Sequence, residues 1–101
     1  MTISQEELPR LLEQAARAMG YPDASVFSIA YMRGNTAVDD MITAELNAAL
    51  NQDTLFCADS VIVGHGITAE VKHNGTTQDK LRAWREASLR AAAMVGERMM
   101  G

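Results

Sequence analysis

The sequence predicts an α+β fold in which a small β-sheet packs against three helices, in the order α-β-α-β-β-α. Apolar residues recur at helical spacing in residues 8–19, 36–51 and 76–99, and at strand spacing in residues 60–73. A chain of 101 residues has the usual length of a single domain. We therefore expect one domain that spans residues 1–101.

An apolar stripe predicts the first helix. Its members fall at i, i+3, i+4, i+7, i+8 and i+11 and are Leu8, Leu11, Leu12, Ala15, Ala16 and Met19. Ser4 and Glu7 have the spacing of a capping box, but Pro9 would remove a backbone hydrogen bond from a helix that begins at Ser4. The helix therefore either begins near Leu8 after a separate turn or bends at Pro9, and Gly20 ends it.

Residues Ala24–Arg33 allow two interpretations. Phe27, Ile29 and Tyr31 occupy every second position in a stretch rich in β-forming residues, which predicts a strand. Asp23 would instead cap a short helix, and the chain would then be mostly helical with one β-hairpin. We expect the strand.

Residues 36–51 predict the second helix, with Thr36 and Asp39 at capping-box spacing. The next segment, Leu55–His73, is the most strand-like of the chain. A β-branched run predicts a strand over residues 60–64, and the alternation of Ile67, Ala69 and Val71 with polar residues predicts another over residues 67–73. The glycine-flanked His65 between them suits the turn of a β-hairpin.

The third helix is predicted over residues 76–99, and its apolar stripe is wider than a surface helix requires. The small residues in the stripe would let another backbone approach closely. We therefore expect a homodimer through this helix, with Trp84 as an anchor of either the core or the interface. The expected interface consists of Trp84, Ala87, Ser88, Ala91, Met94 and Val95.

Charged residues on the same helix are expected on its opposite, solvated side. Glu86 and Arg90 have the i, i+4 spacing of a favourable pair.

The net charge of the chain is −4, which argues against non-specific nucleic-acid binding. Residues 1–71 carry a net charge of −7 and residues 72–101 a net charge of +3, so the two parts can attract each other within one fold or between subunits. A dimeric nucleic-acid-binding protein that uses the basic residues of this helix is one alternative function.

Four residues with metal-binding or nucleophilic side chains cluster in the sequence between residues 57 and 73. They are Cys57, Asp59, His65 and His73. Zinc accepts all these ligand types, and a cysteine beside a histidine can act as a nucleophile, but no Cys-x-x-Cys or His-x-x-x-His spacing is present. A small enzyme, or a ligand- or metal-binding domain that uses this hairpin, is therefore kept as an alternative function. The expectation is no metal, no cofactor and no catalytic site.

The function that these patterns favour is that of a non-enzymatic interaction protein. Such a protein binds another macromolecule as an adaptor, inhibitor, chaperone or assembly component, and we expect it to be homodimeric. Three observations favour this function: an adaptable core with seven methionines, the wide apolar stripe of the last helix, and the opposite net charges of the two parts of the chain. Residues 1–10 are polar and do not resemble a signal peptide, and no apolar run approaches the roughly 20 residues of a membrane span. We expect a cytoplasmic protein.

Overall fold

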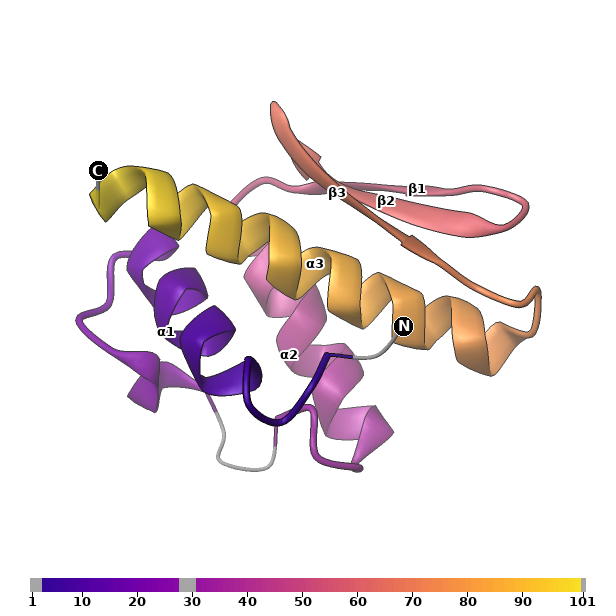
Figure 1. Cartoon of the computed structure of the whole chain (residues 1–101), viewed down its shortest axis with the longest axis horizontal. Coiled ribbons are helices and arrows are strands. Elements are labelled where there is room, and N and C mark those ends of the chain that lie inside the picture. The colour runs from indigo at the N-terminus through magenta and orange to yellow at the C-terminus, as the bar shows by residue number, and fades with distance from the viewer. Residues whose placement is uncertain (1–2, 28–30, 101) are drawn as a thin grey trace.

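A computed structural model describes residues 3–27 and 31–100 of the chain. These residues form three α-helices, one short 3₁₀ helix and a three-stranded sheet, arranged as in Figure 1. The elements follow the chain as α1 (Leu8–Ala18), η1 (Ala24–Val26), α2 (Thr36–Ala49), β1 (Asp53–Phe56), β2 (Ser60–His65), β3 (Ile67–Lys72) and α3 (Thr77–Met100). The α+β class predicted from the sequence is confirmed.

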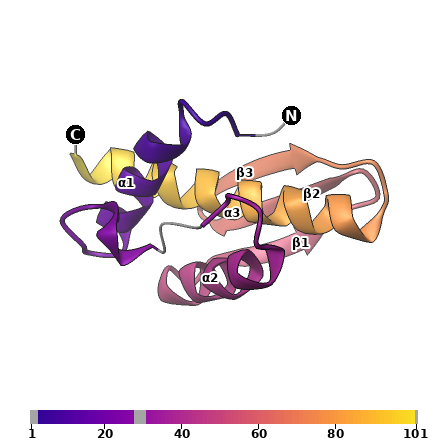
Figure 2. The same cartoon turned by 90° about the horizontal axis from the view of Figure 1, so that it is seen from below.

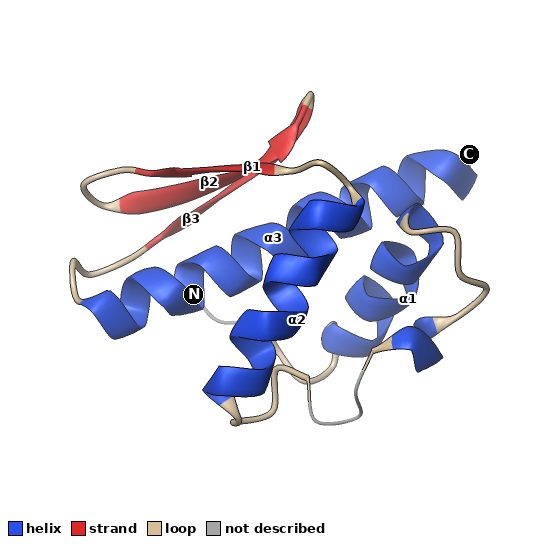
Figure 3. Cartoon of the chain, turned by 180° about the vertical axis from the view of Figure 1, so that it is seen from behind, coloured by secondary structure: helices blue, strands red, loops and turns tan. Residues whose placement is uncertain are grey.

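Helix α3 is the central element of the fold. The sheet covers one side of it, and α1 and α2 lie on the opposite side, as the front and back views both show (Figures 1 and 3). Seen from below, α1 and α2 lie on either side of the α3 axis (Figure 2). α3 is thus covered on two sides, which explains why its apolar stripe is so wide.

Two separate hydrophobic cores reflect this arrangement. The core on the helical side contains Leu89, Ala92 and Ala93 of α3, together with the apolar residues of α1, Phe27, Tyr31 and Leu46. The core on the sheet side contains Ala83 and Ala87 of α3, with Trp84 packed against it. Its strand residues are Val61, Val63 and Val71.

The close contact between α1 and α3 depends on a glycine. A Cβ atom added to Gly96 would lie 1.7 Å from the carbonyl oxygen of Gln14. Ala15, Ala16 and Ala92, which are fully buried, keep the neighbouring positions small. The two helices can therefore approach closely, in the manner that small residues allow at helix crossings.

The sheet is antiparallel throughout, in the order β1-β2-β3. In its register Leu55 lies opposite Ile62 and Val61 opposite Val71. β2 and β3 form the predicted hairpin, and Gly66 between them has a φ of 80°, a conformation that glycine adopts without strain. The predicted helices also form, close to their expected boundaries.

The strand predicted over Ala24–Arg33 is wrong for the described part of that segment. η1 occupies residues 24–26, residues 31–34 form a turn, and residues 28–30 lie outside the described residues. The Asp23 side chain accepts a hydrogen bond from the Ser25 N–H at 2.9 Å, which favours the helical turn. Phe27 and Tyr31 are both buried and their rings stack with centroids 5.4 Å apart, so they fill one core.

The third strand of the sheet is β1, which the sequence analysis did not assign, although Leu55 and Phe56 begin the segment that it considers most strand-like. Its four residues are mostly exposed and show no alternation between buried and exposed positions. The periodicity that reveals a half-buried strand is therefore missing. β1 forms because it pairs with the edge of β2. This contact exists only in the folded chain, so the local sequence does not reveal it.

Candidate functional site

The expected interface residues on α3 are divided by the structure into two groups. Ala87, Ser88 and Ala91 are fully buried by the chain's own elements. Trp84, Met94 and Val95 keep part of their surface exposed. The side chains of the first group are covered within this chain, and the expected homodimer through α3 stays a prediction.

Trp84 ties α3 to β1, and Ser88 ties it to α2. The Trp84 indole N–H donates to Thr54 Oγ1 at 3.1 Å. Ser88 Oγ donates to the Trp84 carbonyl at 2.7 Å and accepts from Asn47 Nδ2 at 3.0 Å. These bonds give both side chains a structural role within the monomer.

The four residues of the predicted metal or nucleophile cluster do not converge. Cys57, Asp59 and His73 lie at one end of β2, whereas His65 lies at the other end, about 17 Å away at the usual rise of a strand. His73 is used structurally: its Nδ1 accepts from the Gly75 N–H at 3.0 Å and its Nε2 lies 3.0 Å from the Cys57 carbonyl oxygen. Among the described residues, no group of three or more His, Cys, Asp or Glu could hold a metal ion.

Two of the basic residues on α3 are paired with acidic residues from the first part of the chain, residues 1–71. Arg85 contacts Asp40 of α2 at 2.7 Å, and Arg90 contacts Glu7 at 3.0 Å. The bond to Arg90 also lowers the pKa of Glu7. The opposite charges of the two parts of the chain therefore meet within one fold, which leaves less positive charge for a nucleic acid.

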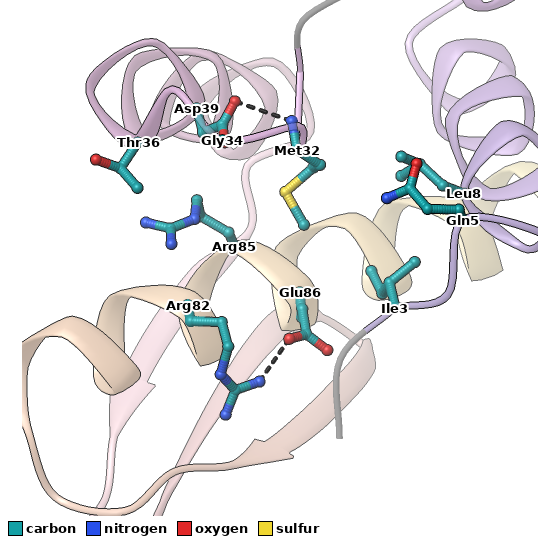
Figure 4. A pocket seen from close by; sticks show the side chains of 10 residues that line it. All are labelled: Ile3, Gln5, Leu8, Met32, Gly34, Thr36, Asp39, Arg82, Arg85 and Glu86. Atoms are coloured by element: carbon teal, nitrogen blue, oxygen red, sulfur yellow. Dashed lines mark hydrogen bonds and ion pairs between the residues drawn. The ribbon is translucent and has the colours of Figure 1, made fainter.

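A concave site with both apolar and charged lining residues lies between the N-terminal segment, residues 32–36 and α3. It is a cavity of about 170 Å³. Figure 4 shows Glu86, Arg82 and Arg85 reaching it from α3, with Met32 and Asp39 across from them. We call it the Glu86 cavity, and its lining consists of Ile3, Gln5, Leu8, Met32, Gly34, Thr36, Asp39, Arg82, Arg85 and Glu86.

Arg82 organises one wall of the Glu86 cavity. Its guanidinium donates to Asp79, to Glu86 and, at 2.9 Å, to the Lys72 carbonyl oxygen. Hydrogen bonds from Arg82 and from the Asn74 N–H lower the pKa of Asp79 to about 2. The bonds to the two carboxylates, that to Asp79 foremost, raise the pKa of Arg82. Arg82 is thus held charged and in one place.

Glu86 is the residue that the sequence analysis placed wrongly. It was expected on a solvated face, paired with Arg90, but it is 1% exposed and pairs with Arg82. Its other carboxylate oxygen, Oε1, is buried and has no hydrogen-bond partner among the described residues. Helical spacing alone cannot reveal this, because the N-terminal segment and residues 32–36 cover that face of α3.

Asp39 was also predicted in another role. The N-cap of α2 is Asn35, whose side chain accepts from the Val38 N–H at 3.3 Å. Asp39 instead accepts from the Met32 N–H at 2.9 Å and is 3% exposed. It therefore holds the turn at residues 31–34 against α2 and shapes the Glu86 cavity.

A second candidate surface is the outer edge of β1. Leu55 and Phe56 are 59% and 53% exposed, large values for such apolar side chains. Within the described residues, β1 pairs only with β2. We call this surface the β1 edge: the side chains of Leu55 and Phe56 and the outward main-chain groups of Thr54 and Phe56.

The outward direction of those groups follows from the ladder. The Cys57 N–H donates to the Ser60 carbonyl at 2.8 Å, so Cys57 is a hydrogen-bonded position. Such positions alternate along an antiparallel pair. Leu55 therefore bonds to β2, whereas the N–H and C=O of Thr54 and Phe56 point away from it.

Comparisons with protein-family models, curated proteins and solved structures give no match to this chain. Among residues 3–27 and 31–100, no helix has the length and hydropathy that a membrane span requires. The functional argument therefore rests on the geometry of this chain.

Proposed function

We propose that this protein is a non-enzymatic interaction protein that binds an extended segment of a partner polypeptide along the β1 edge. The observation that carries the proposal is an exposed apolar pair, Leu55 and Phe56, on a strand that pairs on one side alone within the described part of the chain. Adaptor, inhibitor, chaperone and assembly roles all use such a surface. A cytoplasmic location belongs to the same proposal, supported by the free thiol of Cys57.

Strand addition is supported by the main-chain geometry. An added strand would pair with the outward N–H and C=O groups of Thr54 and Phe56, and main-chain hydrogen bonds give such complexes much of their affinity. Leu55 and Phe56 would contact the partner on opposite faces, because successive side chains of a strand point to opposite sides. An exposed apolar edge without such a partner is an aggregation hazard.

The opposite edge of the sheet is less suited to this role. The His73 N–H donates to the Asp59 carbonyl, so His73 is a hydrogen-bonded position of the β2–β3 ladder. Because such positions alternate along an antiparallel pair, the N–H and C=O of Lys72 point away from β2. The Lys72 carbonyl already accepts from Arg82. The side chains of Thr68 and Glu70 on this edge are polar, whereas β1 offers two large apolar side chains.

The proposal is tested with surface variants of the immobilised protein, exposed to an extract of its source. Leu55→Lys and Phe56→Lys place a charge on the β1 edge, and Met41→Lys places one on α2, where Met41 is 58% exposed. We expect a partner that wild type and Met41→Lys retain and that both edge variants lose. Equal retention by all four proteins would contradict the proposal.

A second copy of this chain is one partner that the same experiment identifies. Two β1 strands pairing antiparallel would place Thr54 opposite the other copy's Phe56, so that all outward main-chain groups are satisfied. Sedimentation of the purified protein then shows a dimer that Leu55→Lys dissociates. A dimer that persists in both Leu55→Lys and Phe56→Lys would contradict pairing of two β1 strands and would favour the interface predicted on α3.

A further inference from the structure

We infer that the Glu86 cavity binds a small aliphatic monoamine, whose ammonium group pairs with Glu86. This site is separate from the β1 edge: it is lined by residues of the N-terminal segment, residues 32–36 and α3, and by none of β1. The inference starts from the unpartnered carboxylate oxygen. A buried ionised acceptor without a donor is costly, and a ligand that supplies a charged donor removes that cost.

The charge around the cavity favours a cation. The two arginines that line it are already paired with acidic residues: Arg82 with Asp79 and Glu86, and Arg85 with Asp40. Asp39 adds one more carboxylate to the lining. The lining residues and their ion-pair partners thus include two guanidinium groups and four carboxylates. The carboxylates belong to Asp39, Asp40, Asp79 and Glu86.

The size and walls of the cavity select a small apolar amine. Ile3, Leu8 and Met32 provide the apolar part of the lining, next to Glu86 (Figure 4). The volume is about 170 Å³. A protein cavity of about 150 Å³ is known to hold benzene, so about four to six heavy atoms fit here. A carboxylate on the ligand would be repelled by Glu86 and Asp39, and the two arginines of the lining are already paired, so we expect an amine without a carboxylate to bind more tightly than an amino acid.

The probe for the test is n-butylammonium, titrated into the full chain by calorimetry and by NMR. We expect saturable binding with amide shifts at Met32, Gly34 and Glu86, no binding of butyrate, and binding of n-butanol weaker by at least about tenfold, because the alcohol lacks the charge. Glu86→Gln keeps an oxygen for Arg82 but removes the negative charge, and it should lower butylammonium affinity by at least about tenfold. The matched control is Glu45→Gln on an exposed part of α2, which should bind as wild type does.

A second variant keeps the test decisive if Glu86→Gln does not fold. Ile3→Ala shortens a half-buried wall residue and leaves the carboxylate in place. It should weaken butylammonium binding but not methylammonium binding, because only the longer amine reaches that wall. The inference is overturned if wild type binds no butylammonium, if Glu86→Gln binds it equally well, or if the shifts map elsewhere. Water alone would then satisfy Glu86.

Discussion

The two layers that α3 joins are packed in different ways. On the helical side, small residues bring α1 against α3 so closely that Gly96 has no room for a Cβ atom. On the sheet side, three valines and two alanines form the core, and β1 keeps Leu55 and Phe56 exposed. The helical layer exposes Met41 as a single apolar side chain on α2, whereas the sheet layer exposes two adjacent apolar side chains on a strand that pairs with β2 alone among the described residues. This difference is what points to the sheet as the surface for association.

Gly96→Ala should produce the largest loss of stability. The new Cβ would meet the Gln14 backbone, which cannot move aside as a flexible side chain can, so the two helices must separate. We expect the free energy of unfolding to fall by about 3 kcal/mol, the upper part of the usual range for overpacking. Denaturant unfolding measures it. Glu97→Ala, at the next and exposed position, is the control and should change little; equal effects of the two variants would show that the helices are not in close contact.

Trp84→Phe should have a smaller effect, confined to the sheet layer. Phenylalanine keeps most of the apolar contact with the sheet core but loses the hydrogen bond to Thr54 Oγ1. We expect a loss of about 1 kcal/mol, the usual net value of such a bond. Hydrogen exchange should report faster opening of β1 than of α1. Uniformly faster exchange throughout the chain would mean that the two layers unfold as one unit.

Asp79→Asn tests the smallest effect, at the junction of β3 and α3. The pKa of Asp79 is about 2 in the folded protein and 3.8 ordinarily, so the folded state holds its proton less readily. Its contribution to stability is therefore present above about pH 4 and is lost as the pH falls from 3.8 towards 2. Unfolding measured across this range should depend less on pH in Asp79→Asn than in wild type. An unchanged pH dependence would show that the ionised Asp79 side chain does not contribute to the free energy of unfolding.

The helices and the hairpin could be predicted because their patterns are local. The stripe of α1, the alternation in β3 and the turn at Gly66 need no knowledge of the rest of the chain. The width of the apolar stripe on α3 is visible in the sequence. The pattern alone does not determine whether the second side of the stripe contacts the same chain or another one. For the same reason Glu86 was expected in solvent: only the folded chain brings the N-terminal segment and residues 32–36 over it.

The segment assigned wrongly, Ala24–Arg33, and the strand left unassigned, β1, have a related explanation. Phe27 and Tyr31 have the spacing of a strand when counted with Ile29, but they are also four residues apart and fill one core. β1 is short and exposed, so its sequence carries almost no strand signal. Its pairing with β2 decides its structure, and its unpaired side is what makes it a candidate for binding.

Amide hydrogen exchange of β1, with and without the bound partner, tests the central claim most directly. The Leu55 N–H faces β2, so it should be protected in both states. The N–H groups of Thr54 and Phe56 face outward, and we expect them to exchange quickly in the free protein and slowly in the complex. Alternating protection of this kind would establish strand addition at the β1 edge. If binding left Thr54 and Phe56 unchanged and protected residues elsewhere, the β1 edge would not be the interaction surface.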